Sequence, residues 1–140
     1  MDIEFLANNW HLFVALVVIV ALLLVDPIRR RTGGVKSISA VEVPQLINHE
    51  SAIVLDVCEV NEFKKGHIPD AINIPVGTLA DNLSRLEKYK KNQTPIVLSC
   101  RSGQRSTKAA GILKKNEFAN LYTLSGGMIS WEKENLPVEH

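Results

Sequence analysis

The hydropathy pattern of the chain begins with a long apolar segment near the N-terminus. Residues 12–25 form an unbroken run of fourteen apolar residues, and residues 5–25 contain only three polar ones, Asn8, Asn9 and His11. As a helix, this segment would rise about 30 Å, which matches the hydrocarbon thickness of a bilayer. The pattern therefore predicts a transmembrane helix over residues 5–25.

A buried core helix and a cleaved signal peptide are the alternatives, because a fourteen-residue apolar run also has the length of a signal-peptide core. Both flanks of the run disfavour cleavage. The preceding residues include Asp2 and Glu4 but no Lys or Arg, and the run ends in LVDP (24–27) without a small-x-small pattern. We therefore expect the segment to be retained as an anchor in the lipid bilayer.

Positive charge predicts the direction in which this anchor is inserted. Arg29, Arg30, Arg31 and Lys36 follow the apolar run, whereas only the N-terminal amine precedes it. Positively charged flanks stay on the cytoplasmic side, so we expect a single-pass protein of the cytoplasmic membrane with its N-terminus outside. The chain then divides into residues 1–33, an anchor with a basic hinge, and residues 34–140, a domain in the cytoplasm.

The second domain alternates between strand-like and helix-like segments. Continuous apolar runs occupy residues 52–57 and 95–99, which is typical of strands buried on both faces of a parallel sheet. Shorter strands are predicted at 35–38, 71–74 and 121–124, and helices at 39–48, 61–65, 78–89, 106–115 and 128–134. This alternation predicts an α/β fold, an open parallel sheet with helices on both faces.

Length and charge narrow the range of functions. A chain of 140 residues accommodates one typical domain beside the anchor, which excludes a multidomain enzyme. Lys and Arg number 16 against 15 Asp and Glu, so the net charge of +1 gives no reason to expect a nucleic-acid partner. The histidines show no ligand spacing with the cysteines, and we predict neither a metal site nor a cofactor.

The segment after the strand at 95–99 carries the candidate chemistry, because ligands of such sheets bind beyond the carboxyl ends of the strands. It reads Cys100-Arg101-Ser102-Gly103-Gln104-Arg105 and leads into a helix. Backbone N–H groups and the helix dipole favour thiolate over thiol there, and the two arginines add positive charge. We predict an anion cradle around the sulfur. The alternative, a small buried side chain without reactivity, is disfavoured by this loop.

Three segments of the domain resemble a single-domain rhodanese, a sulfurtransferase family. They read IVLDVCEVNEFKKGHIPDAINIPV (53–76), PIVLSCRSGQRSTKAAGIL (95–113) and LYTLSGGMISWEKENLPV (121–138). The resemblance implies a five-stranded parallel sheet and a nucleophilic cysteine that carries sulfane sulfur as a persulfide, from a small sulfur donor to a thiol or other thiophilic acceptor. Cys100 falls on that cysteine, and residues 101–105 fall on the substrate-binding loop.

The family is related to a group of cysteine phosphatases, and loop length separates the two. A phosphate cradle of that type has five residues between cysteine and arginine, so that the guanidinium binds two phosphate oxygens. Here Ser106 occupies the arginine position, and Arg105 comes one residue earlier. The shorter loop favours a single terminal sulfur over a phosphate.

Two positions depart from the family pattern. Cys58 follows Asp56-Val57 where many rhodaneses have arginine, which puts substrate affinity in doubt. The Cys58 thiol either fills space at the strand end or acts as a resolving thiol that forms a disulfide with Cys100. We expect Asp56 to accept hydrogen bonds from the backbone or from Arg. Asp70 replaces a glycine common after the Gly-His-Ile-Pro turn, and we expect only a local effect if φ is negative there.

Two functions follow from these observations. The leading one is a membrane-anchored rhodanese-like sulfurtransferase with Cys100 as the sulfur carrier. The alternative is a non-catalytic adaptor of the same fold that docks at a membrane protein complex. The presence of Cys100 favours the first function, and the arginine missing at Cys58 leaves the second open.

Overall fold

The computed structural model describes residues 2–31 and 34–140, and for residues 25–31 it describes the backbone alone. The chain forms two compact units that divide between Gly34 and Val35. Thr32 and Gly33, at the end of the predicted basic hinge, lie outside the described residues.

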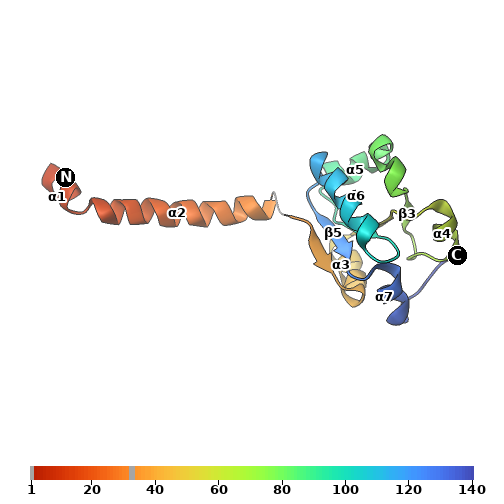
Figure 1. The fold of residues 1–140 in the computed structure, drawn as a ribbon. Coiled ribbons are helices and arrows are strands. Elements are labelled where there is room, and N and C mark those ends of the chain that lie inside the picture. The colour runs from red at the N-terminus through yellow and green to blue at the C-terminus, as the bar shows by residue number, and fades with distance from the viewer. Residues whose placement is uncertain (1, 32–33) are drawn as a thin grey trace. The chain divides into compact units, whose positions relative to one another are not determined.

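Two helices, rather than one, form the N-terminal unit: α1 (Ile3–Asn8) and α2 (Trp10–Arg31) (Figure 1). Asn9 separates them, because its backbone leaves the helical conformation at φ −120° and ψ 17° and its side-chain Nδ2 donates to the carbonyl of Phe5 at 2.9 Å. The single helix predicted over residues 5–25 is therefore wrong in its bounds. Among the described residues, no helix combines the length and the apolar character required to cross a membrane, so the predicted span is not supported.

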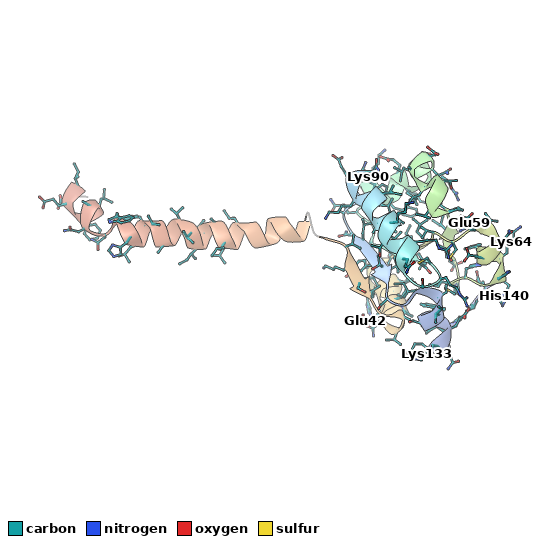
Figure 2. The ribbon with its side chains drawn as sticks, in the orientation of Figure 1. Glu42, Glu59, Lys64, Lys90, Lys133 and His140 are labelled. Carbon is teal, nitrogen blue, oxygen red and sulfur yellow. The ribbon has the colours of Figure 1, made fainter. Side chains whose placement is uncertain are left out.

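The described apolar side chains of α2 are exposed within the N-terminal unit. Every side chain from Leu12 to Leu24 is exposed, including large ones such as Leu23, at 68%. Figure 2 shows these side chains projecting from more than one side of the helix. Among the described residues of its own unit, this segment therefore does not form a buried core helix.

A five-stranded parallel sheet organises the second unit, as the sequence predicts. The strands are β1 (Lys36–Ile38), β2 (Ile53–Asp56), β3 (Ile72–Asn73), β4 (Ile96–Ser99) and β5 (Leu121–Leu124). Their spatial order is β1-β5-β4-β2-β3, and every pairing is parallel. The two predicted continuous apolar runs became the adjacent strands β2 and β4, which lie away from the edges of the sheet and are largely buried on both faces.

Alternate residues of these strands enter two separate cores. Leu55, Leu98 and Cys100 belong to the core on one face, while Val54 and Val97 belong to the core on the other. The first core is covered by the 3-10 helices η2 (Val76–Asp81) and η3 (Leu83–Leu86), by α5 (Glu87–Lys91) and by α6 (Gln104–Lys115). The second is covered by η1 (Ala40–Glu42), α3 (Val43–Glu50) and α7 (Gly127–Lys133) (Figure 1). Helices thus cover both faces, as predicted.

The helix predicted over residues 78–89 is replaced by η2, η3 and α5. Asn82 lies between the two 3-10 helices with φ −117° and ψ 18°, and its side-chain Nδ2 donates to the carbonyl of Thr78 at 2.8 Å. Asparagine competes in this way with the hydrogen bonds of a continuous helix. Leu79 and Leu86 are nevertheless fully buried, so the apolar spacing identified core residues correctly while the element type was wrong.

Gly127, the first residue of α7, provides a stability test of the contact between this helix and the end of β4. Its φ is +58°, and a Cβ atom there would lie 2.4 Å from the carbonyl oxygen of Cys100. Gly127→Ala should lower the free energy of unfolding by about 2 kcal/mol or more, because both the left-handed backbone and the clash oppose a side chain. Chemical denaturation of the full chain measures this effect.

Gly111→Ala is the matched control, because Gly111 lies within α6 and a Cβ atom there would have no neighbour within 4 Å. It should raise stability by about 0.5–1 kcal/mol through the better helix propensity of alanine. Equal stability of the two variants would show that α7 does not need this close contact.

Candidate functional site

Cys100 lies directly after β4, where the chain turns into α6. Gly103 precedes the first residue of α6 and has φ +106°, a conformation that L side chains rarely adopt. This glycine permits a sharp turn, so that only three residues separate Cys100 from the helix. The segment that the sequence identified as an anion cradle therefore forms a short loop at the carboxyl end of a buried strand.

Two backbone N–H groups of this loop point at the Cys100 sulfur. Gly103 N–H donates to Sγ at 3.0 Å and Ser106 N–H donates at 3.4 Å. Cys100 is only 1% exposed, and α6, with twelve residues, directs its N-terminal end toward the sulfur. Donors and a helix N-terminus at this distance stabilise negative charge on sulfur.

The backbone carbonyl of Cys100 is bound by α7, the last helix. Met128 N–H donates to the Cys100 carbonyl at 2.8 Å, and Ile129 N–H donates to the Arg101 carbonyl at 3.3 Å. These bonds use N–H groups from the first turn of α7, which has no partners of its own for them. The loop is thus fixed between the beginnings of α6 and α7.

Arg105 forms a two-point ion pair with Glu62 of α4 (Val60–Lys65). Its two terminal nitrogens lie 2.6 and 2.8 Å from the two carboxylate oxygens. This pair lowers the pKa of Glu62 and raises the pKa of Arg105, each through the hydrogen bonds to the other. The charge of Arg105, which the sequence assigns to a donor anion, is therefore balanced within the protein, while Arg101 is exposed.

Cys58 lies at the end of β2 in a different environment. Burial, reinforced by the nearby charge of Asp56, raises the pKa of the Cys58 thiol to about 12. Burial also raises the pKa of Asp56, which accepts a hydrogen bond from Cys58 N–H at 2.9 Å, as predicted for this carboxylate. Cys58 therefore remains a neutral thiol near neutral pH.

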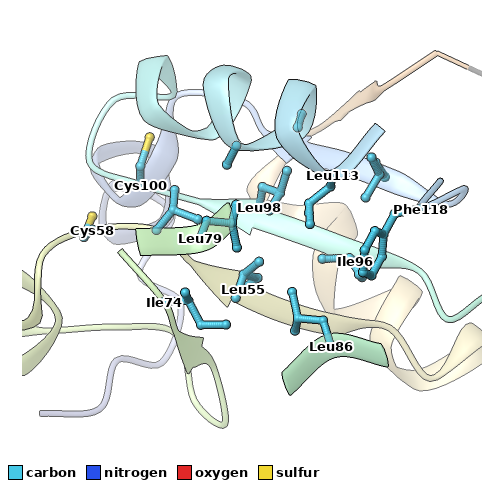
Figure 3. Packing of buried hydrophobic residues seen from close by; sticks show 14 residues of the cluster. Leu55, Cys58, Ile74, Leu79, Leu86, Ile96, Leu98, Cys100, Leu113 and Phe118 are labelled. Atoms are coloured by element: carbon cyan, nitrogen blue, oxygen red, sulfur yellow. The ribbon is translucent and has the colours of Figure 1, made fainter. Parts of the chain in front are cut away.

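Both cysteines are free, and both belong to the same hydrophobic core. Figure 3 shows their sulfur atoms at the same end of this core. Asn73 closes the side next to Cys58, because its Nδ2 donates to the carbonyls of Asp56 and Cys58 at 3.1 and 2.9 Å.

A cavity of about 320 Å³ opens beside this edge of the sheet. Its lining comes from the loop after β2, from α4, from the loop after Cys100 and from α7, and it includes Cys58, Glu62, Lys65, Arg101, Met128 and Glu132. The volume is sufficient for a small ligand.

The turn after α4 is held by the C-terminal residues. His67 and Glu139 exchange two backbone hydrogen bonds of 2.9 Å, and His140 Nδ1 lies 2.8 Å from the Lys65 carbonyl. The ring of His67 stacks on Phe63 and binds its carbonyl at 2.8 Å. Asp70 has φ +63°, so the condition under which its replacement of glycine was expected to matter only locally is not met.

Sequence reasoning identified Cys100, Arg101, Gly103, Arg105 and Cys58 as neighbours of one site, and the structure brings them to one edge of the sheet. It missed the ion-pair partner Glu62, the amide of Asn73 and the contributions of α7. Glu62 and the start of α7 follow predicted strands, which was the one signal for them, whereas Asn73 lies within one. Their contacts with the loop join segments far apart in the chain, which local patterns do not show.

The sequence of this chain is similar to that of known proteins. Residues 39–134 match the rhodanese-like domain. A protein named YibN from Escherichia coli K12 is 34% identical over 136 residues, which cover 96% of this chain and 94% of YibN. A sulfurtransferase from Allochromatium vinosum is 30% identical over 94 residues, which cover 67% of this chain and 84% of that protein.

A solved structure agrees with the fold. The crystal structure of a rhodanese-related protein from Thermoplasma volcanium matches with a TM-score of 0.65 and 32% identity, over 74% of this chain and 97% of that chain. The sheet order, the loop after β4 and the sequence match over most of the second unit agree with one another, and the chain belongs to the rhodanese-like domain family.

Proposed function

We propose that the protein is a sulfurtransferase in which Cys100 carries sulfane sulfur as a persulfide. The observation that carries this proposal is the hydrogen bonding of the Cys100 sulfur. Its Sγ accepts hydrogen bonds from Gly103 N–H and Ser106 N–H at the N-terminus of α6. N–H donors at this distance stabilise negative charge on sulfur, and the anionic sulfur is the nucleophile in this reaction. The relative from Allochromatium vinosum, which is named a sulfurtransferase, supports the same reaction class.

The reaction has two steps at one sulfur atom. The Cys100 thiolate attacks the outer sulfur of the donor, a new S–S bond forms, and the donor leaves with the electron pair of the bond that breaks. A thiophilic acceptor then attacks the terminal sulfur of the persulfide, and Cys100 leaves as a thiolate. The backbone N–H groups stabilise the negative sulfur at the beginning and the end of the cycle.

The first prediction concerns the identity of the carrier. Incubation with a sulfur donor should add about 32 Da to the wild type and to Cys58→Ser, but not to Cys100→Ser, because only a thiolate attacks sulfur. The Cys58 thiol, with a pKa of about 12, stays protonated and unreactive at pH 7. Intact mass spectrometry measures the gain, and sulfur bound to Cys100→Ser would contradict the assignment.

A non-catalytic adaptor is the second candidate function. Cys100 is 1% exposed and Arg105 is already paired with Glu62, two features that favour a docking role over turnover. The same mass experiment separates the two functions, because an adaptor acquires no sulfur from thiosulfate or from an organic persulfide.

We further propose that Arg105 acts as a positioning residue, which joins the first turn of α6 to α4 through Glu62. Glu62→Gln should then slow sulfur loading about tenfold, because a small displacement of positioned groups is costly. The unfolding free energy should change by less than about 1 kcal/mol, because the pair is partly exposed. Loading rates and denaturation curves measure the two effects.

Glu59→Gln is the matched control, since Glu59 is an exposed carboxylate at the N-terminus of the same helix. It should load sulfur at the wild-type rate. If Glu62→Gln instead loads thiosulfate faster, the released Arg105 binds the donor anion directly, and the positioning role is wrong.

We also propose that the N-terminal unit associates with a lipid bilayer in the cytoplasmic membrane, with the second unit in the cytoplasm. The exposed apolar side chains of residues 12–24 support lipid contact, and the three arginines at 29–31 support this direction. Deletion of residues 2–33 should release the protein from the membrane fraction of a bacterial host.

Single cysteines test the direction, in a background that carries Cys58→Ser and Cys100→Ser. Lys133→Cys and Glu4→Cys each place a thiol at an exposed position of a different unit. An impermeant maleimide should label Glu4→Cys in intact spheroplasts and Lys133→Cys only after permeabilisation. The reverse pattern would place the second unit on the outer side.

A further inference from the structure

The parallel sheet gives the second unit two different edges. Because every strand pairing is parallel, the amino ends of the strands lie along one edge and their carboxyl ends, with Cys100, lie along the other. We call these the amino edge and the carboxyl edge. The second unit begins at Val35 and β1 begins at Lys36, so the chain enters this unit at the amino edge, opposite Cys100.

Exposed lysines gather at the amino edge. α5 and α6 both end there in lysines, ahead of β4 and β5, and these two strands and β1 are neighbours in the sheet. Asn120 Nδ2 donates to the Gln93 carbonyl at 2.6 Å, which joins the loops that follow the two helices. The ammonium group of Lys90 lies 5.6 Å from the centre of the Phe118 ring and joins them again. The exposed lysines of this edge are Lys36, Lys88, Lys91, Lys114 and Lys115.

Positive charge exceeds negative charge at the amino edge. Glu87 begins α5, Glu117 follows α6, and Glu50 ends α3 ahead of β2. Among the residues that the structure describes, none of the exposed lysines at this edge forms an ion pair. Their amines are therefore available to an external anion. Because they lie ahead of three neighbouring strands, they suit a broad anionic surface better than one small anion.

The helix dipole alone does not explain this accumulation. It favours lysines in the last turn of any helix, and α4 also ends in two of them, Lys64 and Lys65. That helix, however, lies at the carboxyl edge, where its Glu62 pairs with Arg105. Figure 2 shows Lys90 and Lys64 at opposite ends of the second unit. The excess of lysines thus belongs to the edge at which the chain enters.

We propose that the amino edge binds the anionic phospholipid headgroups of a bilayer, so that the second unit presents its carboxyl edge, with Cys100, away from the membrane surface. This inference rests on the bilayer association proposed above for the N-terminal unit, and it specifies the lipid class and the orientation of the second unit. Each lysine close to an anionic bilayer strengthens binding roughly fivefold. The sulfurtransferase function does not depend on this contact.

The rate at which each lysine is acetylated tests the proposal on the full chain. The protein is mixed with vesicles of phosphatidylcholine, or of phosphatidylcholine with phosphatidylglycerol, and treated with the uncharged reagent N-hydroxysuccinimidyl acetate. Peptide mass spectrometry then gives the rate at each position. On the anionic vesicles the exposed lysines of the amino edge should react about threefold more slowly or less, and Lys64 and Lys65 should react at an unchanged rate. High salt should remove the difference, because it screens exposed charges.

Two lysine pairs provide matched variants, since each lies in the last turn of its helix. Lys114→Gln with Lys115→Gln should weaken the protection of Lys88 and Lys91 on anionic vesicles. Lys64→Gln with Lys65→Gln removes the same net charge and the same favourable contact with a helix C-terminus, and it should preserve that protection.

Flotation of the same samples separates this inference from the association on which it rests. If the chain floats with neither kind of vesicle, the bilayer association itself fails. If the chain floats but anionic lipid protects both edges equally, or neither, the amino edge does not bind headgroups and the association stands. If removal of Lys64 and Lys65 weakens the protection as much as removal of Lys114 and Lys115, net charge is responsible and the proposed orientation is wrong.

Discussion

The hydrogen bond from Met128 N–H to the Cys100 carbonyl joins the end of a central strand to the last helix, and the rest of the site depends on it. It forms only because Gly127 lacks a side chain, so that α7 approaches the backbone of residues 100–101. With its carbonyl fixed, Cys100 presents its sulfur to the opposite side, where Gly103 and Ser106 donate to it. The N-termini of α6 and α7 thus both bind Cys100, α6 at its sulfur and α7 at its carbonyl.

The two cysteines show how strongly position determines chemistry at a sheet edge. They follow neighbouring parallel strands and share one core, yet only one accepts hydrogen bonds from N–H groups on its sulfur. The other lies beside the buried carboxylate of Asp56, and its thiol has a pKa of about 12. A reactive and an unreactive sulfur can therefore occupy one site, and the backbone separates their roles.

Much of the fold was predictable, because buried parallel strands such as residues 53–56 and 96–99 appear as continuous apolar runs. The helix bounds near Asn9 and Asn82 were not predictable, since both depend on a side-chain amide that binds a carbonyl four residues earlier. The loop around Cys100 was predictable because all of its parts are local in sequence. The pairing of Arg105 with Glu62 was not, because it joins residues 43 positions apart.

The pairing of His67 with Glu139 ties residues 139–140 to the turn that follows α4, behind the site. Together with the contact of His140 with Lys65, it holds the turn behind α4, the helix that carries Glu62. Residues joined directly after His140 would therefore lie next to this helix, closer to the ion pair of Glu62 with Arg105 than a fusion at the other end of the second unit. Fusions that begin at the other end of the second unit leave this turn intact, and they are the better choice for measurements of sulfur chemistry.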